Sequence, residues 1–329
     1  MGLFVLWYTD RRKGGDGPGA GVYMMIYRNY EDVHTQAAQM PKKTIAVGGA
    51  HDEVVLEMVA MAAAKDIADF ILVGREGEIR RLAAEQGVTG GFTVINEEDD
   101  KEACLIASDL VRDGEADVLM KGMVNSSTFL HAVLDKERGL RAGKLLSHLA
   151  IYEVPSYPKL MFMCDGGMNT APDLKAKKKI LSNAVEALHR IGIEEPKVAV
   201  VCANEMVDEK IPATVDAAAI AEAAAAGAFG TCIVEGPTAM DLAVSKEAVA
   251  HKGLTSRIAG ETDLFLFPTI ECCNTVGKTL MYFAGGKMTG LVLGAAAPVV
   301  MTSRNETAEG KLNSVMLACL IAHGTEASV

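Results

Sequence analysis

The chain of 329 residues carries a formal net charge of −11 at pH 7, and half of its residues are hydrophobic while only 5% are aromatic. This length exceeds the size at which a single hydrophobic core stops growing, so we expect two domains, and the aliphatic composition suits α/β layers. The negative charge argues against a surface for nucleic acid or anionic membranes, because either needs a basic face.

The seven cysteines include no CxxC pair, so neither a disulfide framework nor a zinc site is expected. We expect them to be small core residues of a protein in the reducing cytoplasm. No run of 18 apolar residues occurs, so no membrane span is expected either.

The first 24 residues join a short apolar start to a glycine-rich polar segment. They lack the basic region of a secretory signal, and Leu6 stands where a myristoylation signal has serine or threonine. Since a more ordinary globular sequence begins at Met25, we expect residues 1–24 to be an added leader outside the fold.

From Thr44 onward, apolar β-branched runs alternate with helical patterns, which predicts βα units and a largely parallel sheet. Strands are expected over residues 44–50, 69–74, 92–96 and 117–122, with helices over 51–66, 78–87 and 100–114 between them. A helix near 127–137 leads to strands at about 149–155 and 159–167, which leave no room for a helix between them. That pair of strands is therefore predicted to be antiparallel.

The second half continues the alternation. Strands are expected over residues 197–203, 231–236, 263–269, 289–295 and 298–302, and helices over 173–191, 214–226, 238–249 and 272–284. Leu312, Val315, Met316 and Cys319 then recur at helical spacing, so a final helix packs one face on a core. Because the antiparallel pair interrupts the doubly wound pattern, we place the domain crossing there. Residues 25–155 with 286–329 form the first predicted α/β domain, and residues 156–285 form the second.

Polar residues that follow a strand are candidates for a site, because ligands collect at the carboxyl ends of strands in α/β sheets. Lys121, Asn125, Ser126 and Ser127 lie between a strand and the start of a helix, where free backbone N–H groups favour an anion. For this stretch alone, an N-cap cluster beside a surface lysine is the better explanation.

Two further strand endings have a similar character. Asn169 follows Asp165 and two glycines, which let a backbone approach a ligand closely, although a tight turn needs the same glycines. Glu271, Asn274 and Lys278 are spaced three and four residues apart, on one face at the start of a helix. Neither ending is decisive by itself.

Ser303 and Arg304 follow the last predicted strand and precede the final helix. Helix initiation explains them too, because Ser303 with Glu306 matches a capping box, or Thr307 caps the helix instead. The chain has no Walker A, GxSxG or HExxH motif, and no GxGxxG motif after a strand. Nucleotide hydrolysis, serine hydrolysis and zinc chemistry therefore lose support.

Taken together and in order, these endings resemble the phosphate acetyl/butyryltransferase family, and within it the shorter butyryltransferases. The resemblance runs from about Lys43 to Ala322. It rests on the segments LMKGMVNSSTFLHAVLDKERGLRAGKLLSHLAIYE, MCDGGMNTAP, VEGPTAMDLAV, SRIAGETDLFLFPTIECCNTVGKTL and LVLGAAAPVVMTSRNETAEGKLNS. It implies a two-domain α/β fold similar to the isocitrate/isopropylmalate dehydrogenases, with the active site in the interdomain cleft.

The resemblance also implies a reversible reaction, in which acyl-CoA and phosphate give acyl phosphate and free coenzyme A. Coenzyme A and phosphate are then substrates, and no permanently bound cofactor or metal is expected. Butyryl is the expected acyl group, with an acetyl-specific enzyme as the alternative. A homo-oligomer whose activity is coupled to an acyl kinase is ordinary for such enzymes.

The family's Ser-Arg pair matches Ser303 and Arg304. Arg304 suits phosphate because a guanidinium binds two phosphate oxygens at once, and Ser303 can donate a hydrogen bond to a thiolate or an oxyanion. However, Gly310 stands where the acetyltransferases have the Asp proposed as the base. Glu309 is the expected catalytic carboxylate, with Glu306 as a nearby substitute and direct attack by a stabilised thiolate as the alternative.

A second departure concerns the binding of phosphate. His131 stands about where the acetyltransferases have an arginine that contacts phosphate, and Arg141 and Lys144 are candidates to supply that charge. The complete expected substrate site comprises Lys121, Asn125, Ser126, Ser127, His131, Arg141, Lys144, Asn169, Glu271, Asn274 and Lys278.

Two other functions stay open at this point. An NAD(P)-linked dehydrogenase of the related fold needs a cluster of aspartates for a divalent metal, and Asp99, Asp100, Asp165 and Asp241 lie in segments that form no obvious shared site. A non-catalytic protein that binds acyl-CoA would account for Gly310 and His131.

Overall fold

The computed structural model describes residues 25–303 and 306–326, so the predicted leader 1–24 lies outside the described residues. Eleven strands of this part of the chain form one sheet, in the order β3-β2-β1-β4-β11-β10-β5-β6-β9-β7-β8. The strands are β1 (Lys43–Gly48), β2 (Ala68–Gly74), β3 (Phe92–Asn96), β4 (Val118–Lys121), β5 (Ser147–Glu153), β6 (Met161–Cys164), β7 (Lys197–Val201), β8 (Ile233–Thr238), β9 (Leu264–Leu266), β10 (Lys287–Leu293) and β11 (Val299–Val300).

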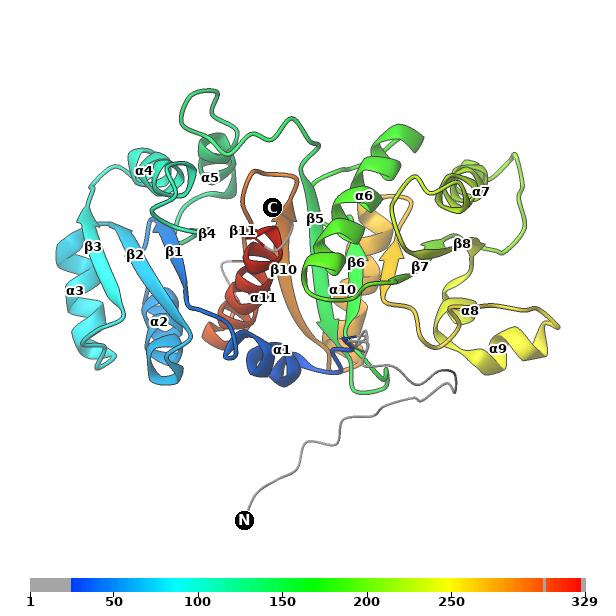
Figure 1. Cartoon of the computed structure of the whole chain (residues 1–329), viewed down its shortest axis with the longest axis horizontal. Helices are drawn as coiled ribbons and strands as arrows, with labels where there is room; N and C mark the ends of the chain where they lie inside the picture. The colour runs from blue at the N-terminus through cyan, green and yellow to red at the C-terminus, as the bar shows by residue number, and fades with distance from the viewer. Residues whose placement is uncertain (1–24, 304–305, 327–329) are drawn as a thin grey trace, which may run out of the picture.

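Helices flank both faces of this sheet (Figure 1). They are α1 (Tyr30–Ala37), α2 (Glu53–Lys65), α3 (Glu76–Glu85), α4 (Asp100–Arg112), α5 (Ser126–Val133), α6 (Leu174–Arg190), α7 (Pro212–Ala225), α8 (Met240–Val244), α9 (Lys246–His251), α10 (Ile270–Phe283) and α11 (Ala308–Glu326). None of these described helices is both long and apolar enough to cross a bilayer.

The predicted α/β layers are confirmed, with two differences in the helices. Helix α1 was not expected from the sequence, and the single helix expected over residues 238–249 is two helices, α8 and α9. Ser245 separates them because its backbone is extended, and its side chain accepts a hydrogen bond from the backbone N of Ala248 at 3.1 Å. Ser245 is thus the N-cap of a new helix.

Alternate residues of each strand bury opposite faces of the sheet. On one face, Leu149 and Ile151 of β5 join a continuous core with α1, α2, α3, α6, α7 and α11. Figure 1 shows α11 against the middle of the sheet, between the elements that precede β5 and those that follow it. Helix α11 therefore ties the two halves of the chain together.

On the other face, the apolar core is divided. Helices α4 and α5 cover one cluster, whereas α8 and α10 cover another that includes Ala150 and Tyr152 of β5. Strand alternation places His148 of β5 and Gly290 of β10 on this same face, between the two clusters. The two apolar clusters on this face are therefore separated by these two residues at the middle of the sheet.

The predicted antiparallel pair is confirmed, because β5 pairs antiparallel with β6. Strand β10 is antiparallel to both β5 and β11, and the other described pairings of the sheet are parallel. In the sheet order, the boundary between β5 and β6 also divides the strands of residues 25–155 and 286–329 from those of residues 156–285. The division of the chain into domains at these residues stays a prediction.

Candidate active site

Strands β4 and β11 run parallel and adjacent, with Val300 paired to Met120, so the residues after them lie at the same edge of the sheet. Lys121 ends β4 and is buried. Its Nζ atom donates to the carbonyl oxygens of Gly122 and Val124 at 3.1 and 3.2 Å. Lys121 thus holds the loop that leads into α5.

Helix α5 begins after Asn125, which takes the N-cap position, and Ser126 and Ser127 are exposed in its first turn. The backbone N–H groups of such a turn have no partner within their own helix and attract anions. Ser303, which follows β11, is exposed at the same edge of the sheet. Arg304, the predicted phosphate ligand, lies outside the described residues.

Strands β6 and β9 end at the opposite edge, because the antiparallel β5–β6 pairing reverses the strand direction. Asn169, after β6, donates from Nδ2 to Oδ2 of the buried Asp165 at 2.6 Å. Asp165 also accepts hydrogen bonds from three backbone N–H groups, those of His148, Gly167 and Met168. The predicted site residues therefore do not share one edge, as a parallel sheet would require, but form two groups.

Helix α10 connects the two groups. Its first turn carries the exposed Glu271, whose pKa is lowered by hydrogen bonds from its own backbone N–H and from the Thr269 hydroxyl. Asn274 donates from Nδ2 to the carbonyl oxygen of Gly166 at 3.2 Å, so it lies beside the loop of Asp165. One turn later, the charge of Lys278 acts on Glu306, in the segment between β11 and α11.

Glu306 lies close to Ser303 and is partly buried, and its backbone N donates to the carbonyl oxygen of Ser303 at 3.2 Å. Burial raises the pKa of the Glu306 carboxyl, while the charges of Lys311 and Lys278 favour its ionised form. A Cβ atom on Gly310 would overlap with Oε1 of Glu306. The Glu306 carboxylate therefore occupies the space that a side chain at position 310 would enter.

Glu309, the expected catalytic carboxylate, faces other groups. Its Oε1 accepts a hydrogen bond from Lys287 at 2.9 Å, and this contact lowers the pKa of the Glu309 carboxyl, with smaller contributions from His34 and Lys65. Both partners of the Lys287–Glu309 pair are more than half exposed. The structure thus brings Glu306, and not Glu309, together with Lys278.

The alternative explanation of Ser303 as a helix cap is wrong. Helix α11 begins at Ala308, and the backbone N of Gly310 donates to Oγ1 of Thr307 at 3.1 Å. Thr307 is therefore the residue that caps the helix, as the second sequence alternative proposed. Ser303 precedes the helix by more than one turn and is not needed to start it.

The three candidates for additional positive charge do not gather. His131 is exposed in the last turn of α5. Arg141 is exposed in the segment before β5, where its backbone forms an isolated bridge with Ala295. Lys144 lies near the start of β5, at the opposite edge of the sheet from Ser303.

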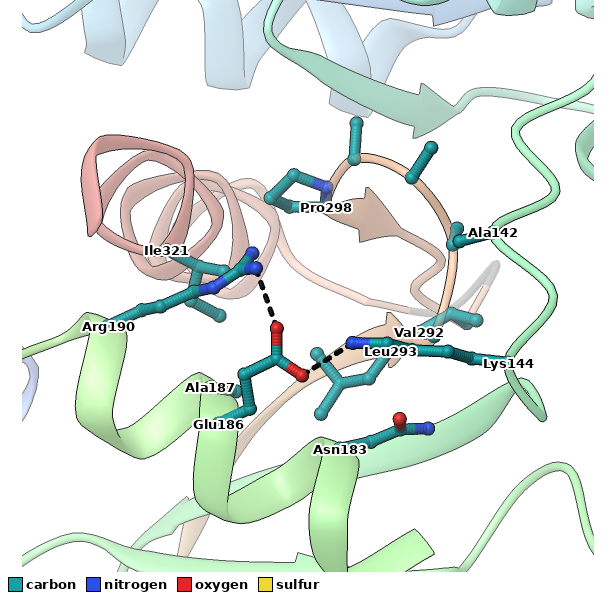
Figure 2. Close-up of a pocket in the computed structure, with 14 residues that line it drawn as sticks. Ala142, Lys144, Asn183, Glu186, Ala187, Arg190, Val292, Leu293, Pro298 and Ile321 are labelled. Atoms are coloured by element: carbon teal, nitrogen blue, oxygen red, sulfur yellow. Dashed lines mark hydrogen bonds and ion pairs between the residues drawn. The ribbon is translucent and has the colours of Figure 1, made fainter. Parts of the chain in front are cut away.

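Lys144 lines a cavity of about 180 Å³ beside α6, the C-terminal half of α11 and the loop of residues 294–298. Figure 2 shows Glu186 between Lys144 and Arg190, and its carboxylate accepts hydrogen bonds from them at 2.6 and 2.7 Å. Lys144, one of the two residues predicted to supply positive charge for phosphate, is thus paired with the Glu186 carboxylate, away from the end of β11.

Lys311 was missed by the sequence analysis. It is 2% exposed, and its Nζ atom donates to Oγ1 of Thr302 at 3.1 Å. The signal was its position, because Lys311 precedes Val315 by four residues and Cys319 by eight, on the apolar stripe of the last helix. Among the residues that the structure describes, no three His, Cys, Asp or Glu side chains are grouped as metal ligands would be.

Comparison with known proteins gives a consistent result. The sequence matches the phosphate acetyl/butaryl transferase family over residues 97–319. Phosphate butyryltransferase from Clostridium acetobutylicum is 44% identical over 298 residues, which cover 90% of this chain and 99% of that protein. Phosphate acetyltransferase from Thermotoga maritima is 36% identical over 280 residues, covering 85% and 95%.

Solved structures resemble the fold. A branched-chain phosphotransacylase from Enterococcus faecalis has a TM-score of 0.74 at 29% identity and covers 85% of this chain and 100% of its own. The 4-hydroxythreonine-4-phosphate dehydrogenase from Klebsiella pneumoniae has a TM-score of 0.55 at 14% identity, covering 86% and 100%. The second likeness is one of fold alone.

Proposed function

The chain belongs to the phosphate acetyl/butyryltransferase family and is a phosphate acyltransferase, and we propose that it moves a butyryl group between coenzyme A and phosphate at the end of β11. The observation that carries the choice of site is the Glu306 carboxylate, which lies beside Ser303 in the space next to Gly310. Support for butyryl comes from the near full-length similarity to phosphate butyryltransferases.

The reaction forms one bond and breaks another. A phosphate oxygen attacks the carbonyl carbon of the thioester, the C–O bond forms, and the C–S bond breaks. The thiolate of coenzyme A then leaves and takes up a proton. We propose that Arg304 holds the phosphate through two of its N–H groups, and that the Ser303 hydroxyl donates to the oxyanion or to the departing sulfur.

The proton needs a partner because a thiol of pKa about 8.5 is only slightly ionised at neutral pH. In place of Glu309 we propose Glu306, which takes the proton of the attacking hydrogen phosphate and gives it to the leaving thiolate. In the reverse reaction it removes the thiol proton and returns it to the phosphate. The raised pKa of Glu306 suits this exchange, because a general acid and base works best when its pKa approaches the working pH. Glu309 is bound to Lys287 and carries no such role.

The remaining expected residues take different roles in this proposal. The first turn of α5, with Asn125, Ser126 and Ser127, receives an anionic group of a substrate, and Lys278 of α10 supplies positive charge near Glu306. Lys121 supports the loop before α5. The other predicted substrate-binding residues lie in the last turn of α5, near the start of α10 or at the opposite edge of the sheet. They are candidates for the rest of coenzyme A: His131, Arg141, Asn169, Glu271 and Asn274.

We also propose a cytoplasmic homo-oligomer whose acyl phosphate product passes to an acyl kinase. The reducing cytoplasm suits the seven free cysteines. An acyl phosphate is a reactive mixed anhydride, so an enzyme that consumes it is required in the same compartment.

The test is a comparison of initial rates with acetyl-, propionyl-, butyryl- and isobutyryl-CoA, measured as thiol released in the presence of phosphate. We expect butyryl-CoA to have the highest kcat/KM. A preference for acetyl-CoA would support an acetyl-specific enzyme, and no thiol release from any of the four would support a non-catalytic protein that binds acyl-CoA.

A further inference from the structure

Lys311 is a buried cation next to the proposed reaction centre. The side chain is 2% exposed in the first turn of α11, and burial lowers the pKa of its ammonium group. Lysines are almost never buried to this extent unless they are paired, because removal of the charge from water is unfavourable. The residue therefore has neighbours that compensate for its burial.

Two segments supply these neighbours, the one between β11 and α11 and the one after β1. Oγ1 of Thr302, the residue before Ser303, accepts a hydrogen bond from Nζ of Lys311 at 3.1 Å. The charges of Asp52, in the loop after β1, and of Glu306 both favour the ionised form of Lys311. Asp52 and Thr302 are themselves 7% exposed, so this cluster is shielded from water.

We propose that Lys311 is a positioning residue for acyl transfer, which holds Thr302 and thereby Ser303, and whose charge favours the ionised form of the Glu306 carboxylate. This inference rests on the proposed function. Neither Lys311 nor Thr302 touches the substrates in it, because both are buried whereas Ser303 is exposed.

Titratable groups from three elements lie near Glu306. Lys311 of α11 and Lys278 of α10 favour its ionised form, and Tyr30 of α1 lies within reach of its charge. Tyr30 stays neutral, because burial raises the pKa of its hydroxyl far above the physiological range. Loss of the Lys311 charge therefore raises the pKa of Glu306 further, since one of two favourable cations is removed.

The experiment compares Lys311→Met with wild type through the pH dependence of kcat/KM for butyryl phosphate and coenzyme A, in which Glu306 must be ionised to accept the thiol proton. We expect the acidic limb of the profile to move to higher pH by about one unit. The matched control is Lys43→Met. Lys43 is also buried, but its Nζ lies 3.1 Å from Oδ1 of Asp117, at the opposite end of β1 from Asp52.

In the control variant Lys43→Met, the acidic limb of the pH profile should stay at the wild-type position. An unmoved limb in Lys311→Met, or an equal shift in Lys43→Met, would overturn the electrostatic role.

Thr302→Val tests the positioning role separately, and this test is valid even if Lys311→Met does not fold. This variant keeps the charge of Lys311 but removes the hydroxyl that accepts its hydrogen bond. We therefore expect kcat to fall about tenfold while the acidic limb of the pH profile stays in place. A wild-type kcat would overturn the positioning role. A wild-type protein without thiol release would contradict the proposed function instead.

Discussion

The carboxylate of Glu306 fills the space beside Gly310, where any larger residue would have to place its Cβ. The two positions are four residues apart, across the start of α11. A glycine at 310 thus makes room for a carboxylate that comes from the preceding turn. In the proposed mechanism, Glu306 supplies the acidic group that the acetyltransferases have at the position of Gly310.

Gly310→Ala should displace the Glu306 carboxylate, because the added Cβ overlaps with the end of a flexible side chain rather than with backbone. We expect kcat to fall about tenfold or more, with the fold retained, since a small displacement of a catalytic group is costly to rate. Steady-state kinetics and circular dichroism measure both effects. The matched control is Gly77→Ala in the first turn of α3, where an added Cβ meets nothing within 4 Å. Equal kinetics of the two variants would show that Glu306 does not need this space.

Glu306→Gln should lower kcat by about 10²–10⁴-fold, as expected when a general acid and base is removed. The pKa of Glu306 is raised, so the wild-type rate of acyl-CoA formation should fall with decreasing pH at values above 4.5, and this limb should disappear in the variant. Glu309→Gln should retain wild-type kinetics, because that carboxylate is paired with Lys287 at the surface. If Glu309→Gln were the inactive variant, the sequence-based assignment would be right after all.

Arg304→Ala should mainly raise the KM for phosphate, by about 10- to 100-fold, because hydrogen bonds to a charged group contribute roughly 1.5–3 kcal/mol. The KM for butyryl-CoA should change little. Lys144→Ala is the control, since its ammonium is bound to Glu186 at the other edge of the sheet. An unchanged phosphate dependence in Arg304→Ala would remove this arginine from the site.

Asp165→Asn should destabilise the protein by about 2 kcal/mol or more, because a charged acceptor of four hydrogen bonds is replaced by an amide with one oxygen. The matched control is Asp173→Asn at the N-cap of α6, where asparagine is an equally good cap. Urea denaturation of both variants measures the difference. Similar midpoints would show that the Asp165 network contributes little to stability.

The sequence was sufficient for the layers of the fold. Alternation of apolar runs predicted the βα units, and the short gap between the strands at 149–155 and 159–167 predicted their antiparallel pairing. The break between α8 and α9 was missed, because the N-cap at Ser245 interrupts a pattern that is otherwise helical. Helix α1 was missed as well.

The geometry of the site was harder to predict. The antiparallel β5–β6 pairing places Asn169 and Lys121 at opposite edges, although each follows a strand in the sequence. Glu306 and Glu309 are only three residues apart, and their directions depend on where α11 begins. Sequence spacing does not specify the first residue of α11. It therefore could not distinguish Glu306, near Lys278, from Glu309, near Lys287.

The most direct test of the account is whether phosphate converts butyryl-CoA into butyryl phosphate with the release of one free thiol. The product should be followed by phosphorus NMR and the thiol by a chromogenic reagent, for wild type and Glu306→Gln. We predict equal amounts of butyryl phosphate and thiol with wild type, and a loss of both in the variant. Thiol release without butyryl phosphate, or a fully active Glu306→Gln variant, would contradict it.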